Sequence, residues 1–583
     1  MAAPTNAANV KKVLANSEPS THGGKADIEI SGRNVWHHRH KAVRLVLGRQ
    51  EKFLVPGVKA RPCEEGAIQS IRVVRDCAAS VKPWVLIATI LASSIAYIDE
   101  SIVNVALPAI ETDLATSVIV VQWLINAYTL TLSSLLLVGG AAGDRFGRRR
   151  LFIVGISVFA AASLWCGISP NVTQLILARA LQGVGAALLI PSALAIIGAT
   201  FAENERGKAI GTWAGFSALA AAAGPLLGGW IVDHFSWRWI FFVNPLLTVP
   251  TVWIALYHVP ESRDPEAKPG LDWQGALLVL IGLGSIAYGL IALPILEWSD
   301  PTVLASLSVG LILLVAFVWV EGRSRAPMLS LPMFRSRTFS VINILTLLLY
   351  GALGGAFFFL PFALIQVRGY PAALAGAAFL PFTVIMAGLS RWAGGLLDNF
   401  GARLPLVIGP AISALGLGLM ALMVSRGPYW EFLIPIVILG FGIVISVAPL
   451  TTTVINSVPA NQTGIASGIN NAVASAANLF AVAILGAVAI GILNRTLDRH
   501  LESATFSTGV QQAIRAAHGS FVIEPALSNI QGADRLAAET IIKGSLAESI
   551  QSVMLIAAVL AISAAAVGSL LPRSIEITDP KDS

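Results

Sequence analysis

The chain has 583 residues, of which 55% are hydrophobic and only 12% are charged. A soluble domain carries about twice that charged fraction, and a mean hydropathy of +0.74 is too apolar for a surface that faces water. The composition therefore excludes an ordinary soluble enzyme, a disordered protein and a collagen-like chain, and it indicates a polytopic membrane protein. The three cysteines, Cys63, Cys77 and Cys166, are too few for a disulfide framework and lack the spacing of metal ligands.

The excess of positive charge lies in the N-terminal tail. Residues 1–82 hold 14 basic and 7 acidic residues, a net +7, so the rest of the chain has a net −1 within the total of +6. The tail has no repeated motif, and we expect a disordered cytosolic segment that touches anionic lipid headgroups rather than a domain that binds nucleic acid. We expect no secretory signal in this tail, because no apolar segment follows Met1. The first methionine after Met1 is Met328, and we expect part of residues 1–75 to be absent from the mature protein.

From Trp84 onward, apolar segments long enough to cross a bilayer alternate with short polar breaks. This pattern predicts an all-α polytopic membrane protein with fourteen transmembrane helices. We place them at 84–106, 119–141, 151–168, 174–199, 209–232, 239–258, 273–293, 302–321, 339–362, 374–397, 405–425, 431–452, 466–492 and 549–571. A longer polar segment, 494–548, separates the last two.

Basic residues favour one orientation of these spans. Most arginines and lysines that lie between spans fall in alternate loops, on one side of the predicted bundle. Because Lys and Arg are enriched in cytoplasmic loops, we expect both termini in the cytosol and segment 494–548 outside. The expected location is the cytoplasmic (inner) cell membrane.

The sequence contains an internal repeat. The pattern D-x-F-G-x-R follows the second span at residues 144–149 and the tenth span at 398–403, and G-x-G…P at 183–191 has a looser echo at 440–449. Two parallel six-helix halves with two helices inserted between them would give this spacing, and parallel repeats are typical of transporters. The predicted organisation is therefore a basic tail (1–82), an N-terminal half (84–258), a linker with two inserted helices (259–321), a C-terminal half (322–571) and a cytosolic tail (572–583).

Ionisable side chains inside the spans are few, and they are the first candidates for function because charge in a membrane is costly. Asp99 and Glu100 lie deep in the first span, and Arg179 lies in the fourth. Each has a structural alternative: a neutral, hydrogen-bonded carboxyl group, or an ion pair that only holds helices together. The functional interpretation is that one carboxyl group carries a proton while Arg179 tunes its proton affinity. Asp99 is the first candidate for the carrier, and Glu100 is its competitor.

Two glycine-containing motifs predict close contacts between helices. Arginines after the second span would orient the chain in any case, but Gly143 and Asp144 are not needed for that. A carboxylate beside a glycine-mediated helix contact can bond a partner in one conformation only. We therefore expect conformational gating by Gly140, Gly143, Asp144, Arg145, Gly147, Arg148, Arg149, Asp398 and Arg403. In the fifth span, tight packing alone would account for the glycine pairs Gly211/Gly215 and Gly224/Gly228, which lie beside Pro225 and Gly229.

The sequence has no phosphate loop, metal cluster, nucleophile elbow or dinucleotide fingerprint. We therefore expect no enzyme activity, no catalytic or metal site, no cofactor and no ATP-driven engine within this chain.

Taken together, the motifs over residues 84–571 resemble the major facilitator superfamily, specifically its 14-helix drug:proton antiporter family (EmrB/QacA-like). Residues 99–108, DESIVNVALP, are similar to the family's helix 1 signature, and the residues from Gly140 to Arg149 are similar to its loop 2–3 signature. The helix 4 signature, which the family ties to proton coupling, is matched by Arg179, Gln182, Gly183, Gly185 and Ala187. Its helix 5 antiporter signature is matched by Gly215, Gly224, Pro225, Gly228 and Gly229.

The resemblance implies a proton-coupled antiporter that exports hydrophobic or amphipathic small molecules by alternating access. Its expected partners are a small-molecule substrate, protons, the lipid bilayer and, as a further candidate, an accessory export protein. Amide and aromatic side chains facing a central cavity would contact the substrate: Gln122, Trp123, Asn126 and Asn343. Two alternatives stay open, a proton-coupled metabolite or nutrient transporter and a non-transporting membrane sensor whose basic tail binds a partner.

Overall fold

The computed structural model describes residues 80–264, 270–296, 299–324, 327–396, 400–458, 463–503 and 506–572. The predictions for the tail before residue 80, for the mature start and for Asp398 lie outside these ranges. Within them the regular structure is helical, without a strand, and fourteen helices are long and apolar enough to cross a membrane. The predicted all-α membrane fold is confirmed.

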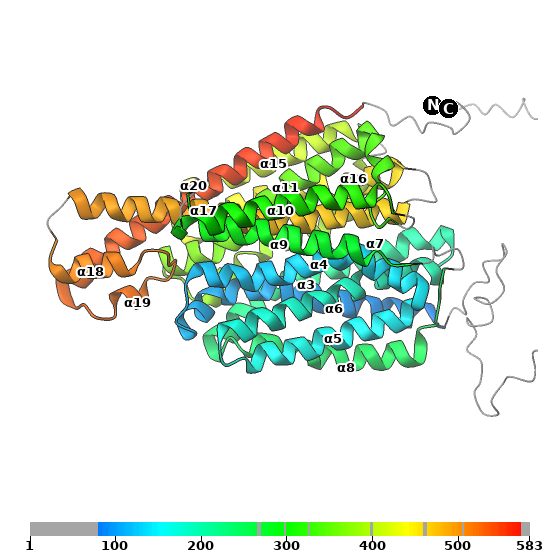
Figure 1. The fold of residues 1–583 in the computed structure, drawn as a ribbon, viewed down its shortest axis with the longest axis horizontal. Helices are drawn as coiled ribbons and strands as arrows, with labels where there is room; N and C mark the ends of the chain where they lie inside the picture. Colours follow the sequence, from blue (N-terminus) through cyan, green and yellow to red (C-terminus); the bar gives the residue numbers. More distant parts are fainter. Residues whose placement is uncertain are drawn as a thin grey trace, which may run out of the picture. The chain divides into compact units, whose positions relative to one another are not determined.

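The first six of these helices pack on one another (Figure 1). α6 contacts both α4 and α5, α3 packs along α7, and α8 covers α3 and α5. Their bounds are α3 (Lys82–Asp113), α4 (Val118–Phe146), α5 (Arg148–Ile168), α6 (Val172–Thr200), α7 (Glu203–His234) and α8 (Trp239–His258).

The next two helices form a pair outside this group. α9 (Trp273–Leu296) packs along α10 (Pro301–Glu321), and α9 also contacts α4 and α17. The pair therefore lies against α4 of the first group and against α17, which belongs to the second group described next.

The remaining spans form a second group. α11 packs on α17 and α20, while α15 packs on α16 and α20. Their bounds are α11 (Arg337–Phe362), which continues as a π-helical turn (Ala363–Val367), α12 (Ala372–Ala377), α13 (Leu380–Gly394), α15 (Arg403–Met423), α16 (Tyr429–Asn456), α17 (Thr463–Ser503) and α20 (Gly532–Gly568). α12 and α13 together make the tenth span.

The sequence repeat has a counterpart in local geometry. A Cβ atom on Gly185 of α6 would lie 2.9 Å from the backbone oxygen of Gly155 in α5, and one on Gly442 of α16 would lie 2.7 Å from that of Gly409 in α15. Only glycines allow these two equivalent helix pairs to approach so closely. Before α5, Gly147 has a φ of +116°, and Gly401 before α15 has a φ of +70°, so the turns of both repeats need glycine.

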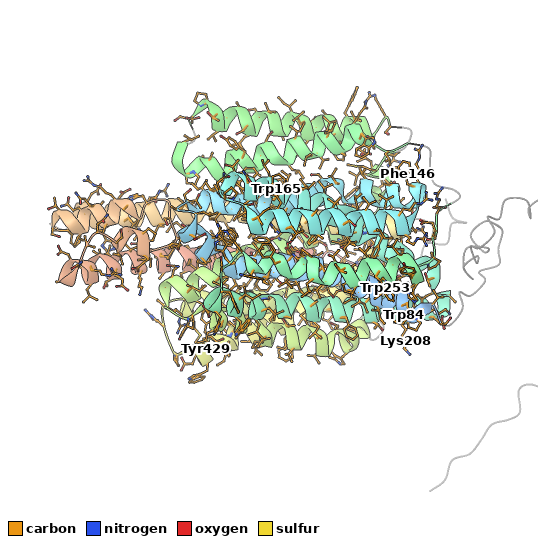
Figure 2. The ribbon with its side chains drawn as sticks, turned by 90° about the horizontal axis from the view of Figure 1, so that it is seen from below. Trp84, Phe146, Trp165, Lys208, Trp253 and Tyr429 are labelled. Carbon is orange, nitrogen blue, oxygen red and sulfur yellow. The ribbon has the colours of Figure 1, made fainter. Side chains whose placement is uncertain are left out.

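The two ends of the bundle differ. One end, which we call the arginine-rich end, carries Arg148, Arg337 and Arg403 at helix starts, and Figure 2 shows Trp84 and Trp253 near it. The other end has Trp165 and Tyr429 nearby (Figure 2). We call it the hairpin end, after the helical hairpin that residues 494–548 form there, described next. Tryptophan and tyrosine at both ends are typical of the two membrane interfaces.

Helices, rather than an irregular loop, form most of the long polar segment 494–548. α17 extends to Ser503, and α20 begins at Gly532, well before the predicted start of the last span. Two short helices, α18 (Thr508–Ala516) and α19 (Glu524–Leu527), lie between them at the hairpin end (Figure 1). Periodicity in a polar segment is a weaker signal than an apolar span, so the sequence indicated these helices only in part.

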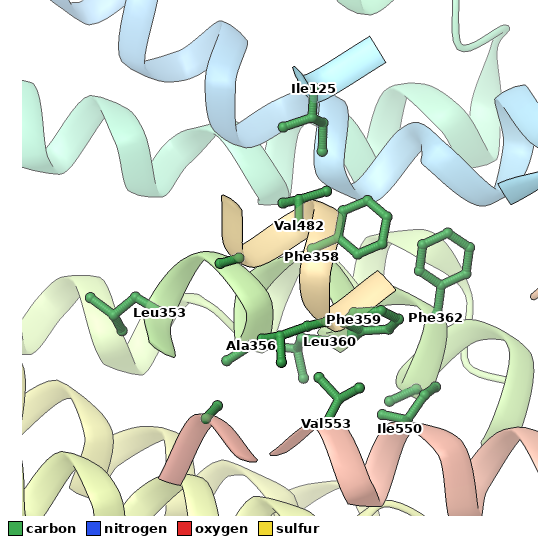
Figure 3. Packing of buried hydrophobic residues seen from close by; sticks show 14 of the residues in the cluster. Ile125, Leu353, Ala356, Phe358, Phe359, Leu360, Phe362, Val482, Ile550 and Val553 are labelled. Atoms are coloured by element: carbon green, nitrogen blue, oxygen red, sulfur yellow. The ribbon is translucent and has the colours of Figure 1, made fainter. Parts of the chain in front are cut away.

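The largest buried cluster of apolar side chains joins the two groups of helices. Phe358, Phe359 and Phe362 of α11 are at most 1% exposed. Phe359 lies toward Ile550 and Val553 of α20, and Phe358 lies beside Val482 of α17 (Figure 3). Val482 of α17 and Ile125 of α4 belong to the same cluster. The polar site described next therefore lies among helices that apolar packing already holds.

Candidate functional site

Asp99 and Arg179 form an ion pair inside the first group of helices. Asp99 lies in the middle of α3 and Arg179 in the first third of α6, and neither side chain is more than 1% exposed. Arg179 donates through Nη1 to Asp99 Oδ2. The structure thus brings together two of the residues that the sequence predicted for proton coupling.

Neutral polar side chains complete the hydrogen bonding of Asp99. Gln182 Nε2 of α6 and Asn244 Nδ2 of α8 both donate to Asp99 Oδ1 at 2.7 Å. The same two amides donate to Ser163 Oγ of α5, at 3.3 and 2.8 Å. One network therefore joins α3, α5, α6 and α8 around a single carboxylate.

Arg179 has partners besides Asp99. Its Nε donates to the backbone oxygen of Leu124 at 3.1 Å, and Nη1 donates to Gln182 Oε1 at 2.7 Å. The centre of the guanidinium lies 4.5 Å from the centroid of the Tyr128 ring, a cation–π distance. Because Leu124 and Tyr128 both belong to α4, Arg179 links α6 to α4 as well as to α3.

Glu100 faces a different neighbour from Asp99. Its Oε1 accepts a hydrogen bond from Asn478 Nδ2 of α17 at 3.4 Å, and its backbone oxygen accepts one from Asn104. Adjacent helical residues point about 100° apart. The third predicted proton-coupling residue is therefore separate from the ion pair and lies where α3 meets α17.

Sequence reasoning missed Ser163, Tyr128 and the role of Asn244. All three are at most 1% exposed, and all three contact the ion pair or its partners. Asn244 lies in the WRWIFFVNP segment, where an amide within an apolar span was the available signal. A single serine or tyrosine in a span carries no such signal, because both are common in membrane helices.

The predicted gating loop between α4 and α5 is held by the chain that follows α8. Asp144 Oδ1 accepts from Arg148 Nε at 2.8 Å, one turn away. The backbone of Asp144 accepts from Asp264 N at 3.0 Å, and Arg148 N donates to the oxygen of Ser262 at 2.9 Å. The loop is thus paired with residues 262–264 by hydrogen bonds from both sides.

Glu261 is the side chain at the centre of this contact, and the sequence analysis did not single it out. Its Oε1 accepts from the backbone of Arg149 at 3.0 Å, and its Oε2 lies 3.6 Å from Arg150 Nε. A Cβ on Gly147 would lie 2.8 Å from Glu261 Oε1. Gly147 therefore serves both the left-handed turn and the approach of this carboxylate.

The other predicted gating residues that the structure describes lie on α4 and at the start of α15. A Cβ on Gly140 or Gly143 would meet Pro191 or Ser192 of α6 at 3.5 and 3.2 Å. Arg145 is exposed and lies over the ring of Phe146. Arg403 begins α15, at the repeat of the position of Arg149.

The glycines of α7 make room for two neighbours. A Cβ on Gly224 or Gly228 would strike Ser101 or Ile102 of α3, and one on Gly229 would strike the backbone of Ala372 in α12. Pro225 lies in the same stretch, and its backbone oxygen contacts Gly376 of α12. Gly215 has no neighbour within 4 Å of such an atom in the described part of the chain, so close packing is seen at the other three glycines of the motif and not at this one.

The four predicted substrate residues do not converge. Gln122 and Asn126 of α4 are fully buried, and their amide atoms have no hydrogen-bond partner among the residues that the structure describes. Trp123 lies toward Tyr288 of α9, with ring centroids 6.4 Å apart. Asn343 of α11 accepts from Asn470 of α17 at 3.2 Å, within the second group of helices.

At the hairpin end, a loop between α18 and α19 contacts the first group of helices. Ser520 Oγ donates to Oε1 of Glu111, a buried residue near the end of α3, at 2.8 Å. Phe521 is fully buried, with its ring centroid 5.4 and 5.5 Å from those of Phe359 and Phe362 in α11. This loop therefore ties α3 to α11.

Comparisons with known proteins agree with this architecture. The family model described as the Major Facilitator Superfamily matches residues 89–482. The chain is 33% identical to the multidrug resistance protein Stp of Mycobacterium tuberculosis, over 72% of this chain and 78% of that protein. It is 35% identical to the puromycin resistance protein pur8 of Streptomyces alboniger, over 80% and 88% of the two chains.

Solved structures show the same fold at low sequence identity. A bacterial homologue of the human lysosomal transporter Spinster superposes with a TM-score of 0.59 at 16% identity, covering 84% of this chain and 98% of that one. A POT family transporter solved in complex with 5-aminolevulinic acid gives a TM-score of 0.55 at 12% identity, covering 83% and 94%. The resemblance noted in the sequence motifs is thus confirmed: the chain belongs to the Major Facilitator Superfamily and is a multi-pass membrane transporter, not an enzyme.

Proposed function

We propose that the chain is a proton-coupled antiporter that exports hydrophobic or amphipathic small molecules by alternating access. The observation that carries the proposal is the buried pair of Asp99 and Arg179, because a charge pair within membrane spans is costly and is usually kept for function. The names of the relatives support export, since they include a multidrug resistance protein and a tetracenomycin C resistance and export protein of Streptomyces glaucescens.

Proton binding to Asp99 would weaken the ion pair that links α3 to α6. A neutral Asp99 no longer attracts Arg179, while Arg179 keeps its bonds to Gln182 and to the backbone of Leu124. The link from α3 to α6 therefore weakens without releasing Arg179 from α4 and α6. Such a selective change is what a proton needs in order to bias one conformation over another.

The driving force is sufficient for export. One proton that crosses down about 100 mV releases roughly 2.3 kcal/mol, and one pH unit adds about 1.4 kcal/mol. Since each 1.4 kcal/mol is tenfold in concentration, one proton per neutral substrate molecule sustains a gradient of about 500-fold.

The loop between α4 and α5 is the proposed gate at the arginine-rich end of the bundle. We place the protein in the cytoplasmic membrane, with this end facing the cytosol. Asp144, Arg148 and Glu261 support this role, because they link the loop to the chain after α8. Arg403 and the positive φ of Gly401 are the equivalents at the second repeat.

Substrate-driven proton flux in vesicles tests the proposal. We expect Asp99→Asn to abolish this flux without loss of protein in the membrane, because asparagine keeps the size and hydrogen-bonding capacity of the carboxyl group but cannot exchange a proton. Flux that survives in Asp99→Asn and disappears in Glu100→Gln would transfer the carrier role to Glu100. Flux that survives in both variants would refute coupling through α3.

A further inference from the structure

Two acidic side chains meet at the arginine-rich end of the inserted helix pair, where α9 and α10 lie side by side (Figure 1). Asp272 directly precedes α9, and Glu321 is the last residue of α10. Glu321 is only 3% exposed. Oδ2 of Asp272 and Oε1 of Glu321 each lie 2.9 Å from the position that a Cβ atom on Gly275 would take. The two oxygens therefore approach the same point.

The second oxygen of each carboxyl group is held by the backbone. Asp272 Oδ1 accepts from the backbone nitrogen of Gly275 at 2.8 Å and so caps the start of α9. Glu321 Oε2 accepts from the backbone nitrogen of Leu329 at 3.2 Å, in the segment that leads from α10 to α11. These bonds orient both side chains, because a turn of either carboxyl group would give up a hydrogen bond.

The described residues place no donor and no cation on the two free oxygens. Neither oxygen has a hydrogen-bond partner there, and the strongest charge that acts on Glu321 is that of Asp272. α17, which packs against α9, has no charged residue between 463 and 494. The charged side chains at this end of α4 and just after α10 have partners of their own: Asp144 bonded to Arg148, Arg145 over the ring of Phe146, and Arg323 over that of Trp319.

Two carboxyl oxygens in this arrangement call for a proton between them. Both are acceptors unless one of the groups is protonated. The two side chains lie within hydrogen-bonding reach of each other, so one shared proton turns a repulsion into a hydrogen bond. A divalent cation is the other candidate, but it prefers about six or more oxygen ligands. The described residues hold no group of three side chains suited to a metal ion.

The acidic pair joins the two linkers that connect the inserted helices to the rest of the bundle. Residues 262–264 bond the gate loop between α4 and α5, and the chain continues from there to Asp272. On the other side, the chain runs from Glu321 to α11, the first helix of the second group. A bond between the two side chains therefore ties these linkers together at the end of the bundle where the proposed gate lies.

From this geometry we infer that Asp272 and Glu321 share one proton, and that this proton acts as a pH-sensitive latch between the two linkers. While it is bound, it joins the start of α9 to the end of α10. When the cytosolic pH rises and the proton leaves, two ionised carboxyl groups repel each other, the linkers separate, and the gate loop gains freedom to move. The latch regulates the transporter from the cytosol, and its proton is distinct from the one proposed on Asp99.

The distance between the ends of α9 and α10 tests the latch. Nitroxide labels on Gln274→Cys and Gly322→Cys, which are exposed positions beside the pair, report this distance by EPR spectroscopy in the full chain in lipid vesicles. Cys63 and Cys77 are replaced by serine in this chain. We expect the distance to increase as the pH is raised from mildly acidic to mildly alkaline. The measurement needs no transport, so it tests the latch whether or not the proposed coupling is correct.

Two substitutions of Asp272 fix the latch in opposite states. Asp272→Asn should keep the distance short at every pH, because its amide donates to Glu321 without a shared proton. Asp272→Ser should keep the distance long at every pH, because its hydroxyl caps α9 but leaves no second oxygen for Glu321. Asp300→Asn is the matched control: Asp300 caps the opposite end of α10, and the substitution should leave the response to pH unchanged.

A single label on Arg263→Cys reports the linker that holds the gate loop. Its mobility should rise over the same pH range as the distance, and this rise should be lost in Asp272→Asn. A distance that does not change with pH, or that changes equally in Asp272→Asn, overturns the latch. A change in distance on adding Mg²⁺ or Ca²⁺ at constant pH overturns the shared proton in favour of a cation. Constant mobility at residue 263 overturns the link to the gate.

Discussion

Asp99 accepts three hydrogen bonds through its two carboxylate oxygens. Two of the donors belong to α6 and one belongs to α8. Oδ2 binds Arg179, while Oδ1 binds Gln182 and Asn244. A buried ion pair by itself rarely stabilises a fold more than well-packed apolar side chains would. The amides are therefore what makes the buried carboxylate tolerable, and a change in either should affect the function of the pair.

Asn244→Ala should lower the maximal transport rate about tenfold or more, because a hydrogen bond to a charged group contributes about 1.5–3 kcal/mol. Thr248→Val is the matched control: it lies one turn along α8, and within the described residues its hydroxyl donates only to the backbone oxygen of Asn244. Transport rates normalised to the amount of protein in the membrane provide the measurement. Equal rates in the two variants would contradict a role for the Asn244 amide.

The residues of the site were predictable only where their chemistry is rare in a membrane. Asp99 and Arg179 stood out because charges in apolar spans are few. Ser163 and Tyr128 did not, since nothing in one sequence distinguishes a serine or tyrosine in a network from one that bonds to its own helix. Glu261 was missed for a similar reason, because an acidic residue in a polar loop is unremarkable until its partners are known.

At the scale of elements, the loop between α18 and α19 is a contact between the two groups of helices. Ser520 bonds Glu111 of α3, while Phe521 packs on α11. Asp233 of α7 also accepts from the backbone of Ala372 and Ala373 at the start of α12, at 3.0 and 2.7 Å. The proposed alternating access requires the two groups to separate at this end, so we expect these bonds to break in each cycle.

A reversible cross-link tests this requirement. In a chain with Cys63 and Cys77 replaced by serine, Glu111→Cys with Ser520→Cys should react with a short bis-methanethiosulfonate linker, lose transport, and regain it on reduction. Arg499→Cys with Glu548→Cys is the control, because this exposed pair joins α17 to α20 within one group of helices. Full transport with the first pair linked would show that the loop moves together with α3.

At the scale of the whole molecule, the length of the apolar segments was enough to predict the number of spans and their approximate bounds. Equivalent glycine contacts between α5 and α6 and between α15 and α16 give the repeat a physical basis. The helices within residues 494–548 could be predicted only in part, because polar helices lack the continuous apolar segments that identify a span. Pairing across the two groups of helices depends on side chains far apart in sequence, which one sequence does not reveal.

Orientation in the membrane is testable by thiol labelling of intact cells. Cys166 is buried and should not react. In a background without Cys63 and Cys77, we expect a membrane-impermeant maleimide to label Ser528→Cys at the hairpin end and to leave Arg263→Cys unlabelled until the cells are opened, because arginine-rich loops favour the cytosol. The reverse pattern would invert the proposed topology.

The length of α17 has a practical consequence. It has 41 residues, about 60 Å at 1.5 Å per residue, whereas the hydrocarbon core of a bilayer is about 30 Å thick. A substantial part of this helix, braced by α20 and α18, should therefore stand clear of a detergent micelle or nanodisc. Transporters that consist only of spans offer few landmarks for aligning particle images in electron microscopy, and this projection is both a landmark and an accessible epitope for an antibody fragment.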